Sequence, residues 1–269
     1  MKGYVLITGA NGGMGRAAAR KFRDMGYSVF ALDRCVSSEN EEGIIPIEAD
    51  VTDEESVKRA FLKVKEYTDR LFAIIHFAGI YMLDSLVEIE KSEFDRIFNI
   101  NLGGVYIVNK TFISMLENGA RVVITTSELA PLDPLPFTGI YAVSKAALDK
   151  YAYSLRMELQ LKGITVSVLR AGAVDTGMLG ASIKALDRFN EKTELYKCNA
   201  ARFKRIVESV EARSVAPEAI AKKVSKIAEK RKPRFAYSIN RNPLLLMLNA
   251  LPKRLQLWII KQVLKEKKK

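Results

Sequence analysis

Cysteine and histidine are scarce in this sequence of 269 residues. The two cysteines, Cys35 and Cys198, lie far apart without the close spacing of metal ligands, so the sequence supports neither a disulfide framework nor a zinc site. His76 is the only histidine, which excludes a site built from several histidines, and no metal is expected. A reducing, cytoplasmic location fits this low cysteine content.

Long hydrophobic runs and repeats are also absent. The apolar run near the N-terminus ends at Thr8, which is too early for the core of a signal peptide or for a segment that crosses a bilayer. Because 48% of the residues are hydrophobic, the chain can bury a sizeable core. A single domain is the simplest expectation.

Basic charge is concentrated in the last third of the chain. Residues 181–269 hold 23 Lys and Arg against 8 Asp and Glu, whereas residues 1–180 hold 20 against 23. Such a surface could meet nucleic acid or anionic lipid, or it could be an ordinary solvated face. It lacks the interleaved aromatic residues of nucleic-acid modules, so no nucleic-acid partner is expected. We interpret residues 184–234 as a solvated face and leave the tail open.

Short apolar segments alternate with longer amphipathic ones along the chain. This alternation predicts an α/β fold, a doubly wound, Rossmann-like parallel sheet of about seven strands with helices on both faces. The predicted strands are Tyr4–Thr8, Ser28–Asp33, Ile44–Glu48, Leu71–His76, Arg121–Thr126, Thr165–Arg170 and Arg234–Ser238. Long helices are predicted over residues 92–117, ending before Gly119, and over residues 141–163, ending at Gly163. Thr52 and Glu55 predict a capping box at the start of the helix after the third strand.

A glycine-rich turn joins the first predicted strand to the first predicted helix. Glycine lets the backbone turn sharply and approach a phosphate closely, and a helix N-terminus offers free N–H groups to it. An ordinary strand-to-helix connection without a ligand is the alternative. The residues of this turn that are expected to contact a dinucleotide are Gly9, Asn11, Gly12, Gly13, Met14 and Gly15.

The end of the second predicted strand supplies another part of the nucleotide site. Asp33 lies 18 residues after Gly15, where a carboxylate can accept hydrogen bonds from the adenosine ribose. Asp33 should repel a 2′-phosphate and therefore favours NAD, but Arg34 could pair with that phosphate and keeps NADP open. Asp50 and Val51 are expected at the adenine edge, although Asp50 could instead cap the following helix.

Tyr141 and Lys145 place a phenol and an ammonium one helical turn apart, and Ser127 lies 14 positions before the tyrosine. Tyrosine normally loses its proton near pH 10, and a lysine at i+4 can stabilise the phenolate. The pair is therefore suited to moving a proton. Taken singly, each residue could instead cap a turn or lie on a helix surface.

Together these motifs resemble the short-chain dehydrogenase/reductase family over residues 4 to about 180. The resemblance rests on the turn Thr8–Gly15, on Asn101 within Asn99–Leu102, on Ser127 and on the Tyr141–Lys145 pair. It implies an NAD(P)-dependent oxidoreductase that interconverts a secondary alcohol and a ketone.

The resemblance also implies roles for individual residues. Tyr141 would exchange a proton with the substrate oxygen, which Ser127 would hold by a hydrogen bond. Lys145 would bind the nicotinamide ribose and, with oxidised nicotinamide, would lower the pKa of Tyr141 towards neutrality. Asn101 would hold a water that links Lys145 to solvent. Further cofactor contacts are expected from Ala78, Gly79, Val174 and Thr176.

Two segments depart from the family's pattern. The family usually has Asn-Asn-Ala-Gly after the fourth strand, whereas this chain has His76–Gly79, and a bracing hydrogen bond is expected of His76. The family's Pro-Gly after the sixth strand is replaced here by Ala171 and Gly172.

The expected organisation is a dinucleotide-binding and catalytic domain over residues 1–241 and a basic amphipathic tail over residues 242–269. Residues 180–216 interrupt the alternation, so we interpret them as an insertion over the active site that selects the substrate. Apolar residues of the segment Leu129–Phe137, with Met178 and Leu179, could line a pocket for a hydrophobic alcohol or ketone, or could be core.

The tail has an apolar side, a tryptophan and terminal lysines. It could lie in a membrane interface, pack on a partner subunit or cover the pocket. Members of the family are often homo-dimers or homo-tetramers, which favours packing. A non-catalytic dinucleotide sensor that binds a partner or a membrane through this tail is the alternative function.

Overall fold

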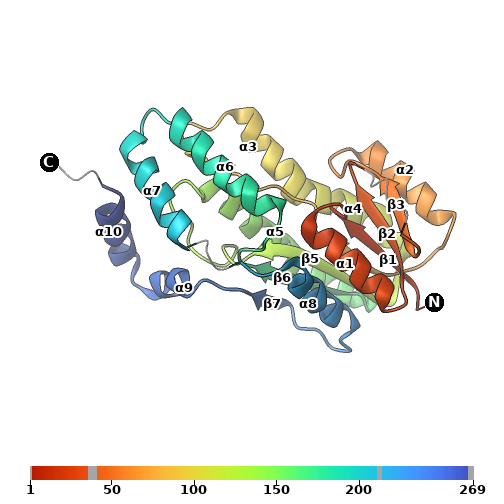
Figure 1. Ribbon diagram of the computed structural model, residues 1–269. Coiled ribbons are helices and arrows are strands. Elements are labelled where there is room, and N and C mark those ends of the chain that lie inside the picture. Colours follow the sequence, from red (N-terminus) through yellow and green to blue (C-terminus); the bar gives the residue numbers. More distant parts are fainter. Residues whose placement is uncertain (1, 36–40, 211–213, 266–269) are drawn as a thin grey trace.

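A seven-stranded parallel sheet forms the centre of the protein (Figure 1). The computed structural model describes residues 2–35, 41–210 and 214–265. The strand order β3-β2-β1-β4-β5-β6-β7 is that of a doubly wound nucleotide-binding sheet, so the predicted fold is confirmed. The strands are β1 (Tyr4–Thr8), β2 (Ser28–Asp33), β3 (Ile44–Glu48), β4 (Leu71–His76), β5 (Leu116–Ser127), β6 (Thr165–Ala171) and β7 (Ala236–Ile239).

Helices cover both faces of the sheet. On one face lie α1 (Gly13–Asp24) and α8 (Pro217–Glu229), and on the other lie α2 (Glu54–Lys65), α4 (Gly104–Phe112) and α5 (Gly139–Leu159). Each face therefore has its own buried apolar cluster, and together the two clusters form the core on which the site is built.

Strand β1 contributes side chains to both apolar clusters. Successive side chains of a strand point to opposite faces of the sheet. Leu6 accordingly lies in one cluster, while Val5 and Ile7 lie in the other, and all three are fully buried. Burial of each such side chain contributes about 1.5–3 kcal/mol.

The long helix predicted over residues 92–117 is wrong in its extent and regularity. The chain forms α3 (Lys91–Phe98), a π-helical turn (Asn99–Gly103) and α4, and β5 has already begun at Leu116. Leu116 pairs with Leu71 of β4 ahead of a register shift, so sheet pairing outweighs the helical pattern at this point.

The predicted capping box of Thr52 and Glu55 is wrong, and the N-cap of α2 lies one residue later, at Asp53. The carboxylate of Asp53 caps the helix by accepting a hydrogen bond from the backbone N–H of Glu55 at 2.9 Å. The hydroxyl and backbone N–H of Thr52 instead donate to Asp50, at 2.7 and 2.8 Å. Aspartate caps as well as threonine does, and the pattern did not distinguish the two neighbours.

The other predicted elements differ from the structure only at their ends. Helix α5 begins at Gly139 and continues through a 3-10 turn to Gly163, which has a left-handed φ of 71°. Strand β7 begins two residues later than predicted and ends at Ile239.

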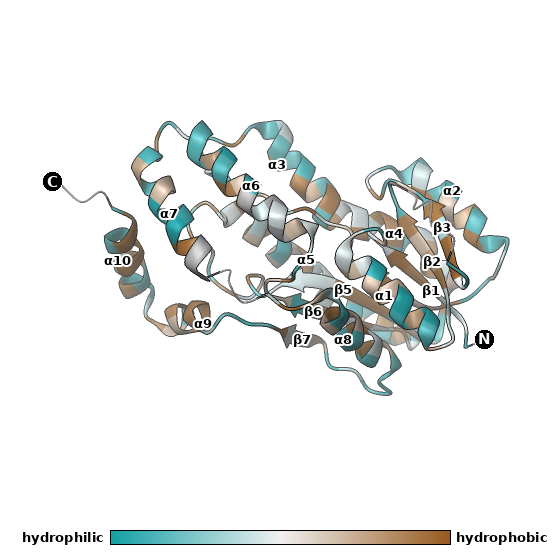
Figure 2. Ribbon diagram, viewed as in Figure 1, coloured by the Kyte–Doolittle hydropathy of each residue, from teal (hydrophilic) through white to brown (hydrophobic). Residues whose placement is uncertain are grey.

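Helices α6 (Gly177–Lys192), α7 (Lys197–Val210), α9 (Pro243–Ala250) and α10 (Lys253–Leu264) lie at one end of the molecule, beside the carboxyl edge of the sheet (Figure 1). Figure 2 shows that α9 and α10 are mostly hydrophobic. Residues 211–213, residues 266–269 and the side chain of Leu179 lie outside the described residues. A third apolar cluster includes Leu83, Phe137, Leu186, Phe189, Ala200, Phe203 and Leu264.

Candidate active site

Two adjoining cavities lie along the carboxyl edge of the sheet, where ligands bind in open α/β folds. The first cavity has a volume of about 1180 Å³ and the second about 790 Å³. The residues that line both are Met14, Phe77, Gly79, Tyr81, Thr176 and Met178. A ligand could therefore extend from one cavity into the other.

The structure divides the predicted site residues between these cavities. The first is lined by Gly9, Asn11, Gly12, Gly13, Met14, Gly15, Asp33, Arg34, Asp50, Val51, Ala78, Gly79 and Thr176. The second is lined by Ser127, Tyr141, Lys145 and Val174. Asn101 lines neither cavity and is fully buried.

The glycine turn has no room for side chains at its first and last glycines. Gly9 has a φ of 66°, and a Cβ there would lie 2.6 Å from the backbone nitrogen of Ala78. A Cβ on Gly15 would collide with the carbonyl oxygen of Gly9. Both positions therefore require glycine for the turn itself, before any ligand is considered.

The N-terminus of α1 is prepared to receive an anion. Its N-cap is Gly12, which offers no side chain to accept the free N–H groups, and the first turn carries no acidic residue. Gly12 and Gly13 are exposed to the first cavity. A helix N-terminus of this kind fits a pyrophosphate, so the residues present fit a dinucleotide.

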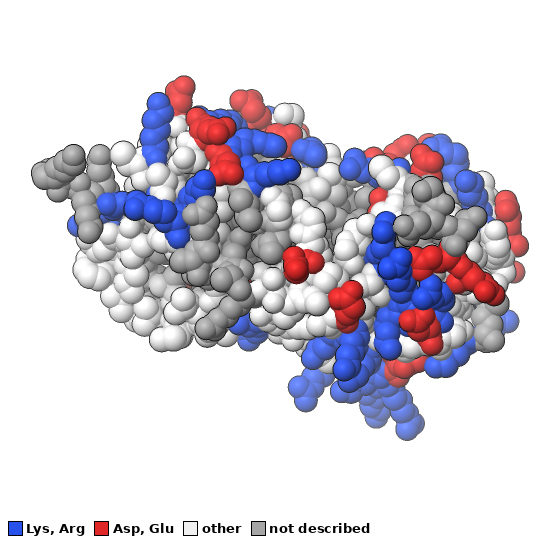
Figure 3. Space-filling view, viewed as in Figure 1, with Lys and Arg blue, Asp and Glu red and all other residues white. Residues whose placement is uncertain are grey.

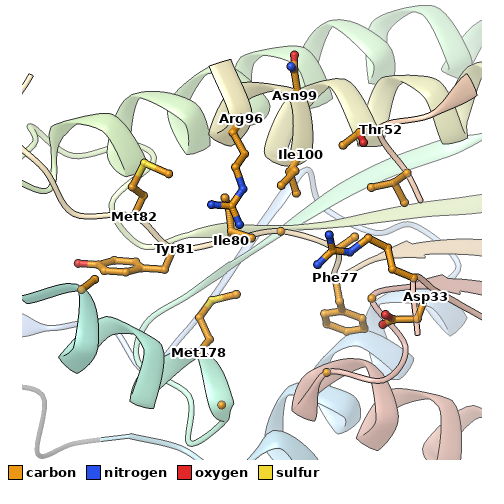
Figure 4. Close-up of a pocket in the computed structure, with 18 of the residues that line it drawn as sticks. Asp33, Thr52, Phe77, Ile80, Tyr81, Met82, Arg96, Asn99, Ile100 and Met178 are labelled. Atoms are coloured by element: carbon orange, nitrogen blue, oxygen red, sulfur yellow. The ribbon is translucent and has the colours of Figure 1, made fainter. Parts of the chain in front are cut away.

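The carboxylate of Asp33 braces the turn as well as facing the first cavity (Figure 4). Its Oδ2 accepts a hydrogen bond from the backbone N–H of Asn11 at 2.9 Å, and its Oδ1 accepts one from Cys35 at 3.3 Å. Each carboxylate oxygen has a further lone pair, so Asp33 can still accept a ribose hydroxyl.

Asp50 does not cap α2, because the N-cap of that helix is Asp53. The alternative role of Asp50 as a helix cap is therefore wrong. Burial opposes its ionisation, but hydrogen bonds from Thr52 and the positive charge of Arg34 outweigh burial and lower the pKa of Asp50. Arg34 and Asp50 thus lie close enough to interact at the same end of the first cavity.

The sequence did not reveal the opposite wall of the first cavity. Figure 4 shows Arg96 and Ile100 reaching into it from α3 and the π-helical turn. Arg96 also pairs with Glu93 at 3.1 Å. No motif distinguishes Arg96 from other helical arginines, because its place depends on how α3 packs beside the sheet.

Ser127 ends β5 and meets Tyr141 of α5. The Ser127 hydroxyl lies near enough to the Tyr141 phenol to lower its pKa, and its Oγ accepts a hydrogen bond from the backbone N–H of Leu129 at 3.2 Å. The neighbouring Thr126 donates to Asp149 at 3.2 Å. Both residues line the second cavity, but the Thr126 hydroxyl is engaged by Asp149, which leaves Ser127 as the residue beside the phenol.

Burial governs the proton affinities of the Tyr141 and Lys145 side chains. Burial raises the pKa of Tyr141 to about 12, partly offset by the Ser127 hydroxyl and reinforced by the charge of Glu128. Burial also lowers the pKa of Lys145 to about 8. The Lys145 Nζ lies 5.9 Å from the Tyr141 ring centre and 3.5 Å from the carbonyl oxygen of Thr125.

The expected lowering of the Tyr141 pKa is therefore not produced by the protein groups themselves. Lys145 is one turn away, as predicted, but desolvation of the phenol is the largest influence on its pKa, and the group that opposes it is the Ser127 hydroxyl. The phenol remains protonated at neutral pH in this environment. A lowered pKa would need the additional positive charge of oxidised nicotinamide.

Asn101 holds the loop after β4 and the helix α5 together. Its Oδ1 accepts from the backbone N–H of Ile80 at 2.8 Å, and its Nδ2 donates to the Ile80 carbonyl and to Ser144 at 3.1 and 3.0 Å. Both amide protons are used, so any water held by this side chain must donate to Oδ1. Asn101 lies in the π-helical turn, an irregularity that is frequent at functional sites.

His76 makes the bracing hydrogen bond expected of it. Its Nε2 lies 3.0 Å from Oδ1 of Asn109 on α4, and burial lowers its pKa to about 4. A buried, neutral imidazole therefore braces the fourth strand against α4, where the family usually has asparagine.

Thr176 and Val174 lie on the segment after β6. The Thr176 hydroxyl caps α6 by accepting from the Met178 backbone N–H at 3.3 Å, and its side chain lies against Gly13. Val174 bridges to Val215 and lines the second cavity. The segment therefore joins the glycine turn to the second cavity.

The second cavity is walled mostly by apolar residues. Leu129, Leu135 and Met178 line it, as the apolar-pocket interpretation predicts. Its charged lining residues are Glu128, Lys145 and Arg241. The sequence missed Glu128. The tail covers this cavity, which is one of the alternatives that the sequence left open, and it supplies Pro243, Leu244, Leu245, Leu248, Ile259, Ile260, Val263 and Leu264.

Comparison with known proteins gives one consistent result. A family model described as short chain dehydrogenase matches residues 3–187. The NADPH-dependent 1-acyldihydroxyacetone phosphate reductase of Schizosaccharomyces pombe is 32% identical over 178 residues, which are 64% of this chain and 60% of the length of that protein.

Two further relatives extend the likeness over most of the chain. The uncharacterized oxidoreductase YbbO of Escherichia coli K12 is 30% identical over 247 residues, covering 89% of this chain and 86% of its own. The crystal structure of a short chain dehydrogenase family protein from Francisella tularensis superposes with a TM-score of 0.74 at 21% identity, covering 88% of this chain and 96% of the other.

Proposed function

Because the chain belongs to the short-chain dehydrogenase family of NAD(P)-dependent oxidoreductases, we propose that it interconverts a secondary alcohol and a ketone. The observation that carries this proposal is that Ser127, Tyr141 and Lys145 line one cavity, which adjoins the cavity of the glycine turn. The names of its relatives, which are reductases and oxidoreductases, support it.

In the proposed reaction Tyr141 is the acid and base. For reduction, its phenol donates a proton to the carbonyl oxygen while the Ser127 hydroxyl holds that oxygen in place. A bound nicotinamide coenzyme would supply the hydride to the carbonyl carbon in this direction and accept it in the reverse. The raised pKa keeps the phenol protonated at neutral pH, as the proton donor for reduction must be.

Lys145 and Asn101 act through position and charge in this proposal. Lys145 would bind the nicotinamide ribose with its buried ammonium. Asn101 fixes the loop at Ile80 and the helix at Ser144, and so sets the distance between the wall of the first cavity and α5. The water link to solvent stays a prediction.

Two coenzymes are candidates, and we keep NAD as the expected one. The Asp33 carboxylate faces the cavity where a 2′-phosphate would lie and would repel it. Arg34 lines the same region and supports NADP, as does the printed name of the fission yeast relative. The glycine turn would bind the pyrophosphate of NAD and of NADP in the same way.

The substrate is proposed to be an apolar ketone or alcohol. The second cavity is large enough for a lipid-sized molecule and has few charged residues in its wall. The fission yeast relative is named for an acylated ketone, which supports the same class. Residues 180–216 are proposed to select the substrate, since α6 and α7 contribute to this cavity.

The alternative function is a non-catalytic dinucleotide sensor. The basic tail supports it, but the grouping of Ser127, Tyr141 and the buried Lys145 on one cavity supports catalysis. The cytoplasmic location, the homo-oligomer and the boundary at residue 241 stay predictions. Within residues 2–35, 41–210 and 214–265, no helix has both the length and the apolar character needed to span a bilayer.

Thermal unfolding with NADH and with NADPH, followed by a panel of ketones in the better coenzyme, tests the proposal. We expect stabilisation of about 3 kcal/mol when the coenzyme is present at about 100 times its Kd, and oxidation of the reduced coenzyme by at least one apolar ketone. Coenzyme binding without turnover of any ketone would favour the sensor. No stabilisation by either coenzyme would contradict both functions.

A further inference from the structure

The outward surface of the C-terminal segment, residues 241–265, combines apolar and basic side chains. We call these residues the tail platform. Leu257 is 69% exposed and Trp258 59% exposed on α10, and Leu244 and Met247 are similarly exposed on α9. Large apolar side chains gathered in this way mark an interaction surface. Figure 2 shows both helices at one end of the molecule.

The charges of the tail platform all have one sign. Its sequence contains no Asp or Glu, and its cations are Arg241, Lys253, Arg254, Lys261 and Lys265. Lys253 pairs with Asp133. Arg254 and Lys261 are exposed, and no carboxylate among the described residues pairs with either. The partner of this surface should therefore be anionic as well as apolar.

An anionic bilayer meets these requirements better than a second copy of the chain. A two-fold interface would set the same patch against itself and so bring the exposed cations Arg254 and Lys261 towards their own copies. A lipid surface accepts exposed leucines and a tryptophan at the headgroup level, and its negative charge attracts lysine and arginine. Because no described helix spans a bilayer, the contact would be peripheral.

The inner side of the same segment forms part of the second cavity. Leu245, Leu248 and Leu264 line that cavity, and Leu264 is buried in the third apolar cluster. Leu244 both lines the cavity and is 61% exposed, so cavity wall and outward surface meet at this residue.

Polar contacts fix the tail platform to the strand that carries Ser127. The carboxylate of Glu128, the next residue, accepts a hydrogen bond from the backbone N–H of Asn242 at 2.6 Å. The backbone N–H of Asp133 donates to Asn249 at 2.7 Å. The position of the platform is thereby tied to the catalytic residues.

We propose that the tail platform seats the protein on an anionic bilayer and admits a bilayer-resident ketone to the second cavity. The binding half of this inference depends on the surface of residues 241–265 alone. The substrate half rests on the proposed function. The two halves are tested separately.

Trp258 makes the binding test direct, because it is the only tryptophan of the chain. The full-length protein is sedimented with vesicles of phosphatidylcholine alone or mixed with phosphatidylserine, while its fluorescence is recorded. We expect binding to the mixed vesicles with a blue shift, and much weaker binding to phosphatidylcholine. Equal sedimentation with both vesicles, or no shift, would overturn the proposal.

A double variant, Arg254→Gln with Lys261→Gln, should weaken binding to the mixed vesicles about 30-fold. The matched control is Lys230→Gln with Lys232→Gln, which removes the same charge from exposed positions after α8. Figure 3 shows the dense group of lysines and arginines around α8. Equal losses in the two variants would mean nonspecific charge attraction and would contradict a platform.

The variant Leu257→Glu tests the apolar part of the tail platform. It also tests whether a second copy of the chain, and not a membrane, covers this surface. We expect it to lower vesicle binding about tenfold while leaving thermal stability and mass in solution unchanged. A wild-type dimer that this variant converts to a monomer, without any effect on vesicles, would identify a second copy as the occupant and overturn the membrane proposal.

Activity separates the substrate half from the proposed function. The Arg254→Gln and Lys261→Gln variant should lose turnover of a long-chain ketone held in mixed vesicles, yet keep turnover of a short, water-soluble ketone. Equal turnover of the vesicle-held ketone by the variant and the wild type would contradict delivery from the bilayer. If the wild type reduces neither ketone but binds vesicles, the proposed function fails and the membrane contact stands.

Discussion

The region from β1 to β6 and the group formed by α6, α7, α9 and α10 are built in different ways. In the first, the helices α1, α2, α4 and α5 come between strands and pack on the sheet, and the buried positions repeat at short range. In the second, helices pack around Phe137 and close over the strand ends, with partners far away in the chain.

The difference assigns a separate task to each region in the proposed function. The first region holds the glycine turn, Ser127, Tyr141 and Lys145 at the edge of a rigid sheet. The second shapes the cavity in which a substrate would lie. Changes in the first region should therefore affect every substrate alike, whereas changes in the second should affect substrates selectively.

The largest expected effect is that of Tyr141→Phe, which removes the proton and leaves the ring. We expect turnover of any ketone to fall about 1000-fold, because no other group is placed to supply that proton. The stabilisation by coenzyme should be unchanged in thermal unfolding. The control is Tyr153→Phe, an exposed tyrosine of the same helix, which should keep full turnover. If Tyr141→Phe turned over ketones as fast as the wild type, the proposed division of tasks between the two regions would be contradicted.

A smaller but still large effect is expected of Gly15→Ala. The added Cβ meets the carbonyl oxygen of Gly9, so the turn must shift at the N-terminus of α1. Strain of about 1–3 kcal/mol should raise the Kd of the coenzyme about 10- to 100-fold, measured by titration calorimetry. Gly180→Ala, whose Cβ would lie in open space on α6, is the control and should leave that Kd unchanged.

His76 tests the first of the two regions alone. It joins β4 to α4 at a position where the family usually has asparagine. Its pKa falls from 6.5 to about 4 on folding, so the folded state holds it neutral. Its contribution is therefore complete above pH 6.5 and is lost as the pH falls towards 4.

The measurement is urea unfolding of the wild type and His76→Asn at pH 7 and pH 5. Between these values the wild type should lose about 2 kcal/mol more than the variant, which cannot titrate at this position. The same loss in both proteins would show that the imidazole does not stay neutral in the folded state.

The smallest expected effect is that of Glu128→Gln, at the boundary between the two regions. Burial is the main cause of the raised pKa of Tyr141, and the negative charge of Glu128 adds to it. Removing that charge should lower the Tyr141 pKa, so the pH profile of alcohol oxidation should move about one unit lower. Glu158→Gln, farther along α5, should not move it. An upward shift of the pH profile would contradict the conclusion that the charge of Glu128 raises the pKa of Tyr141.

Much of the fold and of the catalytic group could be predicted because the signals are local. The turn Thr8–Gly15 follows a strand directly, and Tyr141 and Lys145 are one turn apart on one helix. Ser127 was identified by its place at a strand end, and it lines the second cavity. For each of these residues, a few neighbours in sequence determine the geometry.

The features that were missed depend on distant partners. Leu116 extends β5 because it pairs with Leu71, a residue 45 positions away. The sequence left several places open for the tail, and its place at the second cavity involves the contact of Asn242 with the distant Glu128. The raised pKa of Tyr141 depends on how completely the finished fold buries the phenol. None of these conditions is visible in a short stretch of sequence.

Transfer of a labelled hydride tests the central claim most directly. The wild type is incubated with NADH or NADPH that carries deuterium at the transferable position and with an apolar ketone, and the alcohol is examined by mass spectrometry. We predict one deuterium on the carbinol carbon with the wild type, and almost none with Tyr141→Phe at the same coenzyme occupancy. Saturation with coenzyme and no labelled alcohol from any ketone would contradict the account.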